Sequence, residues 1–289
     1  MFAASPFYDG TLTELETHLT KGSMLPSVWL PMMIVQGFTA VFGFIILPSL
    51  LMWMLIWRQD QSFVGLFRKV NPKIIFVSFL ILFSFLVVDS AIAMWNKNLD
   101  FPTWMDGFEK WARQWEDTQA RMTSYLTEFK TVGQFLVGLV VVAVIPGIGE
   151  EILFRGIVQN EFYRGTKNIH AAIWISAILF SAFHIQFFGF FPRLLLGALF
   201  GYLYYWSGSL WVPIAAHFLN NGVIVFALYL YNTGELQSVN PNEEVAAPWG
   251  AILLCTGTLI LLLIYFKKLT DEQSARLPDR DGNSSPSID

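Results

Sequence analysis

Charged residues are scarce in this chain of 289 residues, because Asp, Glu, Lys and Arg together make up only 14% of it. An average soluble domain is near 25% charged, so the composition excludes an ordinary soluble protein. There is one cysteine, Cys255, which excludes an intrachain disulfide framework. The basic residues are scattered and the net charge is -4, so the sequence excludes nucleic acid as a partner.

Long apolar runs fill the sequence instead, with 54% apolar residues and a mean hydropathy of +0.50. A helix that crosses a hydrocarbon core of ~30 Å needs roughly 20 mostly apolar residues. Runs that approach this length begin near Val28, Ile74, Val132, Ile169, Leu194, Leu210 and Trp249. Because spanning helices satisfy their own backbone groups, we predict an all-α, polytopic transmembrane bundle of about seven to eight spans, with membrane lipid as a partner.

Four regions follow from the composition. Residues 1–27 are a polar N-terminal segment, and 28–130 hold a transmembrane pair plus an amphipathic helix. Residues 131–267 form the transmembrane core that carries the candidate site, and 268–289 are a polar tail that we expect to be disordered. Near 104–129, Trp104, Trp111 and Trp115 recur at helical spacing among charged residues, which predicts a helix lying in the headgroup plane.

The loops that separate the apolar runs are short, and lysine is rare. These features favour a bacterial inner (plasma) membrane, with an endoplasmic-reticulum membrane as the alternative. By the positive-inside rule, the basic loops place the N-terminus outside and the C-terminus in the cytoplasm.

Ionisable residues occur inside three of the apolar runs. An ionisable side chain in hydrocarbon costs from ~3 to more than ~10 kcal/mol, so such residues are functional candidates by default. If Gly165–Asn168 is the tip of a helical hairpin, Glu150 and His184 both lie about 22 to 24 Å from it and are level. His217, only ~12 Å into its own helix, is the least well placed of the three.

Spacing within each run brings further side chains onto one helix face. Residues four positions apart on a helix are neighbours. The pairs at this spacing are Glu151 with Arg155, Phe180 with His184, and His217 with Asn221. Three helices therefore present paired functional side chains that can converge on one wet pocket. A buried ion pair is an equal alternative for Glu151 and Arg155, Asn220 is an alternative to Asn221, and Phe180 is expected to shape the pocket.

These motifs, in this order, with Phe154-Arg155-Gly156 and Gly208-Ser209-Leu210-Trp211-x-Pro213, resemble the CPBP family of intramembrane endopeptidases. That family comprises CAAX prenyl proteases of the Ras-converting type and their bacteriocin-processing relatives, and the resemblance covers roughly Val132 to Val225. It implies cleavage of a membrane-anchored or prenylated peptide without a covalent intermediate or a required cofactor. Glu150, assisted by His184, would activate water, while His217 and Asn221 would stabilise the oxyanion. Arg155 would pair with Glu151.

Three other functions remain open at this stage. Glu150, His184 and His217 are all possible zinc ligands, which would make the protein a zinc-dependent version of the same protease. Glu and His chains also carry protons through transporters, although the two halves of this chain show no pairing. An immunity or scaffold protein that binds a membrane partner without hydrolysis is the third alternative.

Overall fold

The computed structural model describes residues 3–21, 24–57, 66–238, 240–241, 243 and 245–276. These parts of the chain contain helices, turns and irregular segments but no β-strand, which confirms the predicted all-α class. The helices are α1 (Leu12–Lys21), α2 (Pro26–Ala40), α3 (Leu47–Trp57), α4 (Pro72–Lys97), α5 (Asp106–Leu126), α6 (Val132–Gly138), α7 (Ile145–Glu151), α8 (Asn160–Thr166), α9 (Ile169–Phe183), α10 (Phe190–Ser207), α11 (Trp211–Asn232) and α12 (Trp249–Arg276).

In the part of the chain that the structure describes, three π-helical segments connect helices without a break. The segment η2 (Val41–Ile46) joins α2 to α3, while η5 (Leu139–Val144) and η6 (Ile152–Gln159) join α6, α7 and α8. Together, α6, η5, α7, η6 and α8 form one continuous helix of 35 residues, from Val132 to Thr166. Short π-helical turns occur preferentially at functional sites, and here they flank the two adjacent glutamates.

Within the described ranges, five helical stretches are long and apolar enough to cross a membrane: Pro26–Met54, Pro72–Lys97, Val132–Thr166, Trp211–Asn232 and Trp249–Ala275. The protein is therefore an integral membrane protein. Helices α9 and α10 occupy the predicted runs from Ile169 and Leu194, but α9 has only 15 residues. At 1.5 Å per residue α9 is ~22 Å long, which is shorter than a ~30 Å hydrocarbon core.

The predicted hairpin at Gly165–Asn168 is confirmed, because α8 and α9 pack side by side on either side of this turn. Lys167 ends α8 in the left-handed conformation, with φ of 55°. The Asn168 side chain then accepts a hydrogen bond from the Ala171 N–H at 3.1 Å and caps the start of α9. Glu150 and His184 therefore lie on two antiparallel neighbours.

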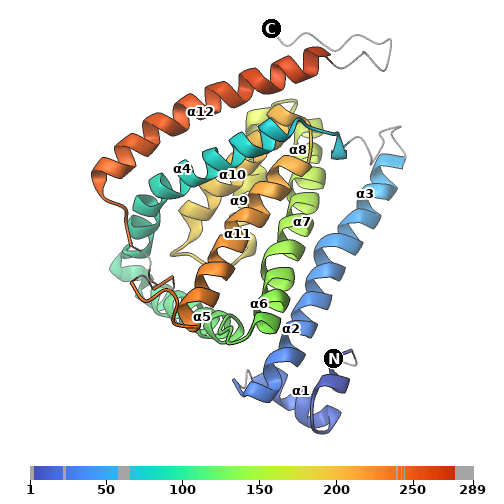
Figure 1. Ribbon diagram of the computed structural model, residues 1–289, viewed down its shortest axis with the longest axis vertical. Coiled ribbons are helices and arrows are strands. Elements are labelled where there is room, and N and C mark those ends of the chain that lie inside the picture. Colours follow the sequence, from blue (N-terminus) through green and yellow to red (C-terminus); the bar gives the residue numbers. More distant parts are fainter. Residues whose placement is uncertain are drawn as a thin grey trace.

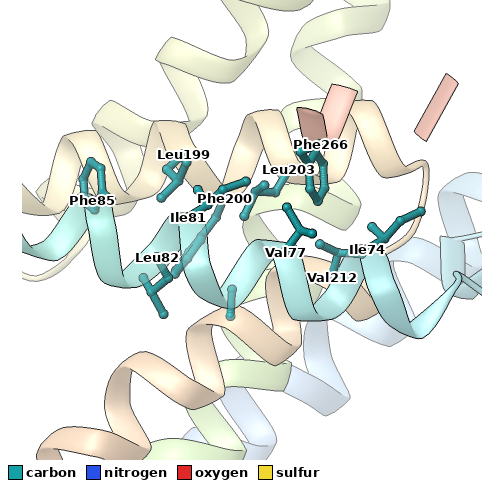
Figure 2. Packing of buried hydrophobic residues seen from close by; sticks show 11 residues of the cluster. Ile74, Val77, Ile81, Leu82, Phe85, Leu199, Phe200, Leu203, Val212 and Phe266 are labelled. Carbon is teal, nitrogen blue, oxygen red and sulfur yellow. The ribbon is translucent and has the colours of Figure 1, made fainter. Parts of the chain in front are cut away.

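The largest apolar core lies where α4 meets α10, α11 and α12 (Figure 1). Figure 2 shows Ile81 and Phe85 of α4 beside Leu199 and Phe200 of α10. Phe200 is completely buried and also stacks on the His217 ring, with ring centroids 5.3 Å apart. The core therefore extends up to the candidate site and limits the movement of His217.

The structure confirms the helix predicted near 104–129 and corrects part of the prediction for the C-terminal tail. The amphipathic helix near 104–129 is confirmed as a helix, α5, whereas its location in the headgroup plane stays a prediction. The expected disorder of 268–289 is wrong for residues 268–276, because α12 continues to Arg276. Lys267 pairs with Asp271 at 3.2 Å, and the Asn71 N–H donates to Gln273 Oε1 at 2.7 Å, which ties this end to α4. Residues 277–289, the rest of that tail, lie outside the described residues.

Candidate active site

The two adjacent glutamates stand at the end of α7, where small residues allow other helices to approach. A methyl group at Gly147 would lie 3.1 Å from the Phe218 backbone nitrogen of α11. At Gly149 it would lie 2.6 Å from Phe44 of η2. Small residues at such crossings let membrane helices pack backbone against backbone. As a result, α11 brings His217, the residue before Phe218, directly beside the glutamates.

Glu151 and Arg155 form an ion pair that is closed to solvent. Their side chains are 0% and 1% exposed, and Arg155 Nη1 donates to Glu151 Oε1 at 2.9 Å. The other guanidinium nitrogen, Nη2, donates to the Gly197 carbonyl of α10 at 2.7 Å. The guanidinium also lies over the Phe180 ring, 4.8 Å from its centroid. The predicted pairing is confirmed, and it fixes Glu151 in one position.

His217 lies between the two glutamates. Its Nδ1 is 2.7 Å from Glu151 Oε1, and its Nε2 is 3.9 Å from Glu150 Oε2. The Glu151 carboxylate, already paired with Arg155, can only accept a hydrogen bond, so Nδ1 of His217 is the donor. The second ring nitrogen therefore faces Glu150.

This arrangement corrects the expectation that His217 is the least well placed residue. That expectation assumed that α11 begins at the same depth as the tip of the α8–α9 hairpin. Instead, Leu210, just before α11, lies 3.5 Å from a methyl group placed on Gly156, and it belongs to the same apolar cluster as Ile152. Gly156 is about nine residues, or ~13 Å, from the hairpin tip, so α11 begins deeper and His217 reaches the level of Glu150.

The two glutamates differ in what can reach them. The Glu150 side chain is 12% exposed, whereas the Glu151 side chain is fully buried. Only Glu150 therefore presents a carboxylate that water or a substrate can approach. Glu151 is closed to water, and its contacts with Arg155 and His217 instead orient those two side chains.

His184 follows the last residue of α9 and has one ring nitrogen committed. Its Nδ1 lies 2.9 Å from the Phe180 carbonyl oxygen, which can only accept, so Nε2 is the available nitrogen. On the neighbouring helix, Phe154 contacts the rings of Phe180 and Phe183, with centroids 5.2 and 6.2 Å apart. Glu150 is one helical turn before Phe154, and in an antiparallel pair this puts it level with the end of α9.

Phe180 connects the two histidines. Its ring centroid lies 5.2 Å from that of His184 and 6.1 Å from that of His217, and each pair is edge-on. The side chain is 2% exposed and also lies under the Arg155 guanidinium. It forms an apolar wall between the two imidazoles, which agrees with the pocket-shaping role expected for it.

Asn221 bonds to the Val142 carbonyl oxygen, which lies in the π-helical segment η5 just before the glutamates. The Asn221 Nδ2 donates to that oxygen at 3.1 Å, and the Asn220 Nδ2 donates to Asn221 Oδ1 at 3.0 Å. One N–H of the Asn221 amide is used in this way, and its second N–H is left for another acceptor.

The donor geometry does not favour the zinc alternative. Among the described residues, no group of three or more His, Cys, Asp or Glu side chains is placed to hold one metal ion. Glu150, His184 and His217 therefore do not fit a shared zinc site in this arrangement. The absence of a cofactor requirement stays a prediction.

Sequence reasoning missed two side chains that hold the backbone just after His184. Asn96 of α4 and Glu116 of α5 both bond to Phe187, which lies three residues beyond His184. Both are far from the motifs along the chain, and neither has a spacing pattern that points to the site. The sequence offers one weak signal for Asn96, because it is a polar residue at the end of an apolar run. In the structure Asn96 is completely buried.

The fold and this cluster define a class: an integral membrane protein whose helices enclose a reachable carboxylate next to an imidazole and an amide. Residues 132–223 match the family described as Type II CAAX prenyl endopeptidase Rce1-like. This match confirms the resemblance that the motifs predicted, and the matched segment contains every predicted site residue.

Two proteins of Bacillus subtilis (strain 168) are similar to part of this chain. "Uncharacterized protein YpbD" is 28% identical over 89 residues, which are 29% of this chain and 42% of that protein. "Putative membrane peptidase YdiL" is 31% identical over 87 residues, which are 30% of this chain and 35% of that protein. The similarity thus spans less than half of each relative. No solved structure matches the chain.

Proposed function

We propose that the protein is an intramembrane endopeptidase that hydrolyses a peptide bond in a membrane-associated substrate. The observation that carries this proposal is the contrast between a reachable Glu150 and a buried Glu151, with His217 held between them. A carboxylate that water can approach, in a site lined by apolar rings, is suited to general-base catalysis. The Rce1-like match and the named membrane peptidase relative support the same reaction class.

In the proposed reaction, Glu150 takes a proton from water, with His184 assisting, and the resulting hydroxide adds to the substrate carbonyl carbon. The carbonyl oxygen then becomes an oxyanion, which accepts hydrogen bonds from His217 and from the second N–H of Asn221. When the tetrahedral intermediate collapses, the C–N bond breaks and Glu150 passes its proton to the leaving amine. No covalent enzyme intermediate forms, and no metal takes part in any step.

Geometry supports His217 as the oxyanion donor. Its Nδ1–H is held by Glu151, and its Nε2 faces Glu150, beside which the substrate carbonyl would lie. An imidazole that carries hydrogen on both ring nitrogens can donate through Nε2 to the oxyanion while Nδ1 stays on Glu151. Glu151 and Arg155 then act as positioning residues that hold the imidazole in the required orientation.

The proposed substrate is a membrane-anchored peptide, and whether it carries a lipid is left to the test. The family description names prenyl endopeptidases, while both relatives come from a bacterium. We also propose that the protein resides in a bacterial plasma membrane. Purified protein in lipid nanodiscs is assayed on quenched peptides that are matched in sequence, with and without a farnesyl group, each with and without a chelator.

The decisive variants are Glu150→Gln, His184→Ala and His217→Ala. We expect Glu150→Gln to abolish turnover, and loss of an oxyanion donor at His217 to lower kcat roughly 100- to 1000-fold. Glu161→Gln, on the same helix but in a half-exposed ion pair with Arg164, is the matched control and is expected to retain activity. Retained turnover in Glu150→Gln would remove the proposed base, and loss of activity with chelator would restore the zinc alternative.

A further inference from the structure

The backbone that follows His184 is held by helices outside the family-matched segment. A single carboxylate oxygen, Glu116 Oε1 of α5, accepts from the Phe187 N–H at 2.5 Å and from the Phe188 N–H at 2.9 Å. Hydrogen bonds to a charged acceptor are stronger than those between neutral groups. Glu116 therefore fixes two successive amides of the turn between α9 and α10.

Asn96, near the end of α4, holds the same turn from another side. Its Nδ2 donates to the Phe187 carbonyl oxygen at 3.0 Å, and its Oδ1 accepts from the Phe191 N–H at 2.8 Å. Asn96 is 0% exposed, so both bonds are closed to water. Together with Glu116, it satisfies both backbone polar groups of Phe187.

Side-chain packing adds to these bonds. The Phe187 ring lies edge-on to Phe108, with centroids 5.0 Å apart, and 5.8 Å from Trp111. The Arg113 guanidinium lies 4.0 Å from the centroid of Phe188, and Arg113 is itself held by Glu109 at 2.7 Å. Side chains of α5 therefore pack on both Phe187 and Phe188.

Two physical facts explain why the turn needs outside partners. Helix α9 is too short to cross the hydrocarbon core, and irregular backbone at membrane depth must find partners within the protein. In addition, Ile185, the residue after His184, has φ of 51°, which is unfavourable for a β-branched residue. The turn therefore adopts a conformation that its own sequence does not favour.

We propose that α5 and the end of α4 form a clamp that sets the position of the His184 ring, with Glu116 as the central positioning residue. This inference rests on the proposed function for its catalytic meaning. The clamp holds Phe187 and Phe188, and the strained residue Ile185 transmits that restraint to His184. Releasing the clamp lets the imidazole leave its place beside Phe180 without removing any group that touches substrate.

The test compares Glu116→Ala with Glu116→Gln in the full chain in nanodiscs. Glutamine keeps a side-chain oxygen that can accept both amides, whereas alanine leaves them without an acceptor. The matched control is Asp117→Ala, at the exposed position that follows on the same helix. Three readouts are taken: amide hydrogen exchange of a peptide covering 184–190, the rate of diethyl pyrocarbonate modification of His184, and kcat with KM.

In Glu116→Ala we expect exchange at Phe187 and Phe188 to rise roughly tenfold or more, because their bonds open locally. We expect faster modification of His184 and a kcat lower by about tenfold or more, with KM unchanged, because a misplaced catalytic group slows chemistry and not binding. Glu116→Gln and Asp117→Ala should behave as the wild type. If Glu116→Ala does not fold, Asn96→Ala takes its place, because it removes the bonds that α4 makes to the turn. Asn96→Ala should then show the same changes in exchange, His184 modification and kcat.

Unchanged exchange, or faster exchange with unchanged His184 modification, would overturn the clamp. Where the wild type cleaves the peptides, an unchanged kcat in a variant with faster exchange would also overturn it. If the wild type cleaves no peptide, the proposed function fails, but exchange and modification still decide whether the clamp positions His184. The two proposals can therefore fail separately.

Discussion

Removing Arg155 should destabilise the protein far more than removing a surface charge. In Arg155→Met the Glu151 carboxylate stays fully buried without its cation, and the Gly197 carbonyl loses its donor. Breaking a buried ion pair by removing one partner typically costs ~3–5 kcal/mol, since an uncompensated charge is left behind. We expect the unfolding free energy of Arg155→Met to fall by that amount, measured by SDS titration in mixed micelles.

Two further variants make this prediction specific. Glu161→Gln breaks the ion pair with Arg164. The Glu161 and Arg164 side chains are 41% and 23% exposed, so this change should lower the unfolding free energy by only ~0–1 kcal/mol. Adding Glu151→Leu to Arg155→Met removes both buried charges and leaves the His217 Nδ1–H without its acceptor, so the total cost should fall to ~1–3 kcal/mol. The reasoning is refuted if Arg155→Met costs no more than Glu161→Gln, or if the double variant is the less stable of the two.

Three other predictions follow from contacts described above. Gly147→Ala should destabilise the bundle by ~1–3 kcal/mol, because its methyl group would press on the Phe218 backbone, whereas Gly250→Ala, with open space around it, should be neutral in the same titration. The Phe101 N–H and Arg113 hold the pKa of Glu109 below its ordinary value, so its stabilising effect is complete above the ordinary value of 4.5 and is lost only as pH falls through the lowered pKa. Glu109→Gln should therefore reduce stability at neutral pH and flatten the acid limb of the stability profile, and an unchanged profile would contradict this. A spin label at Trp104, which is 81% exposed, should report headgroup depth by collision with oxygen and nickel reagents, and bulk-water values would rule out an interfacial α5.

Features that depend on residues close together in the chain could be predicted from the sequence alone. The spacing of Glu151 and Arg155 predicted their ion pair, because residues four apart on a helix are neighbours whatever surrounds them. The Gly165–Asn168 turn predicted a hairpin, and its helices formed as expected. Motif order was enough to predict the family match over residues 132–223.

Other features depended on how the helices are placed. Glu150 and Glu151 are adjacent, and only burial reveals that one is reachable and the other closed. The depth of His217 depended on where α11 begins, which the close approach of Leu210 to Gly156 reveals. Glu116 lies 71 residues from Phe187 along the chain, so no local pattern could connect them.

The turn between α9 and α10 also bears on modularity. All the predicted chemistry lies within residues 132–223, yet the amides of Phe187 and Phe188 take their acceptor from α5, and the Phe187 carbonyl accepts from Asn96 of α4 as well as from the nearby Phe190 N–H. Cut out alone, that stretch would expose bare backbone groups to lipid, where each unsatisfied group costs several kcal/mol. Residues 132–223 therefore do not form an independent unit. If they were transplanted into another membrane protein, that protein would have to supply hydrogen-bond partners for this turn.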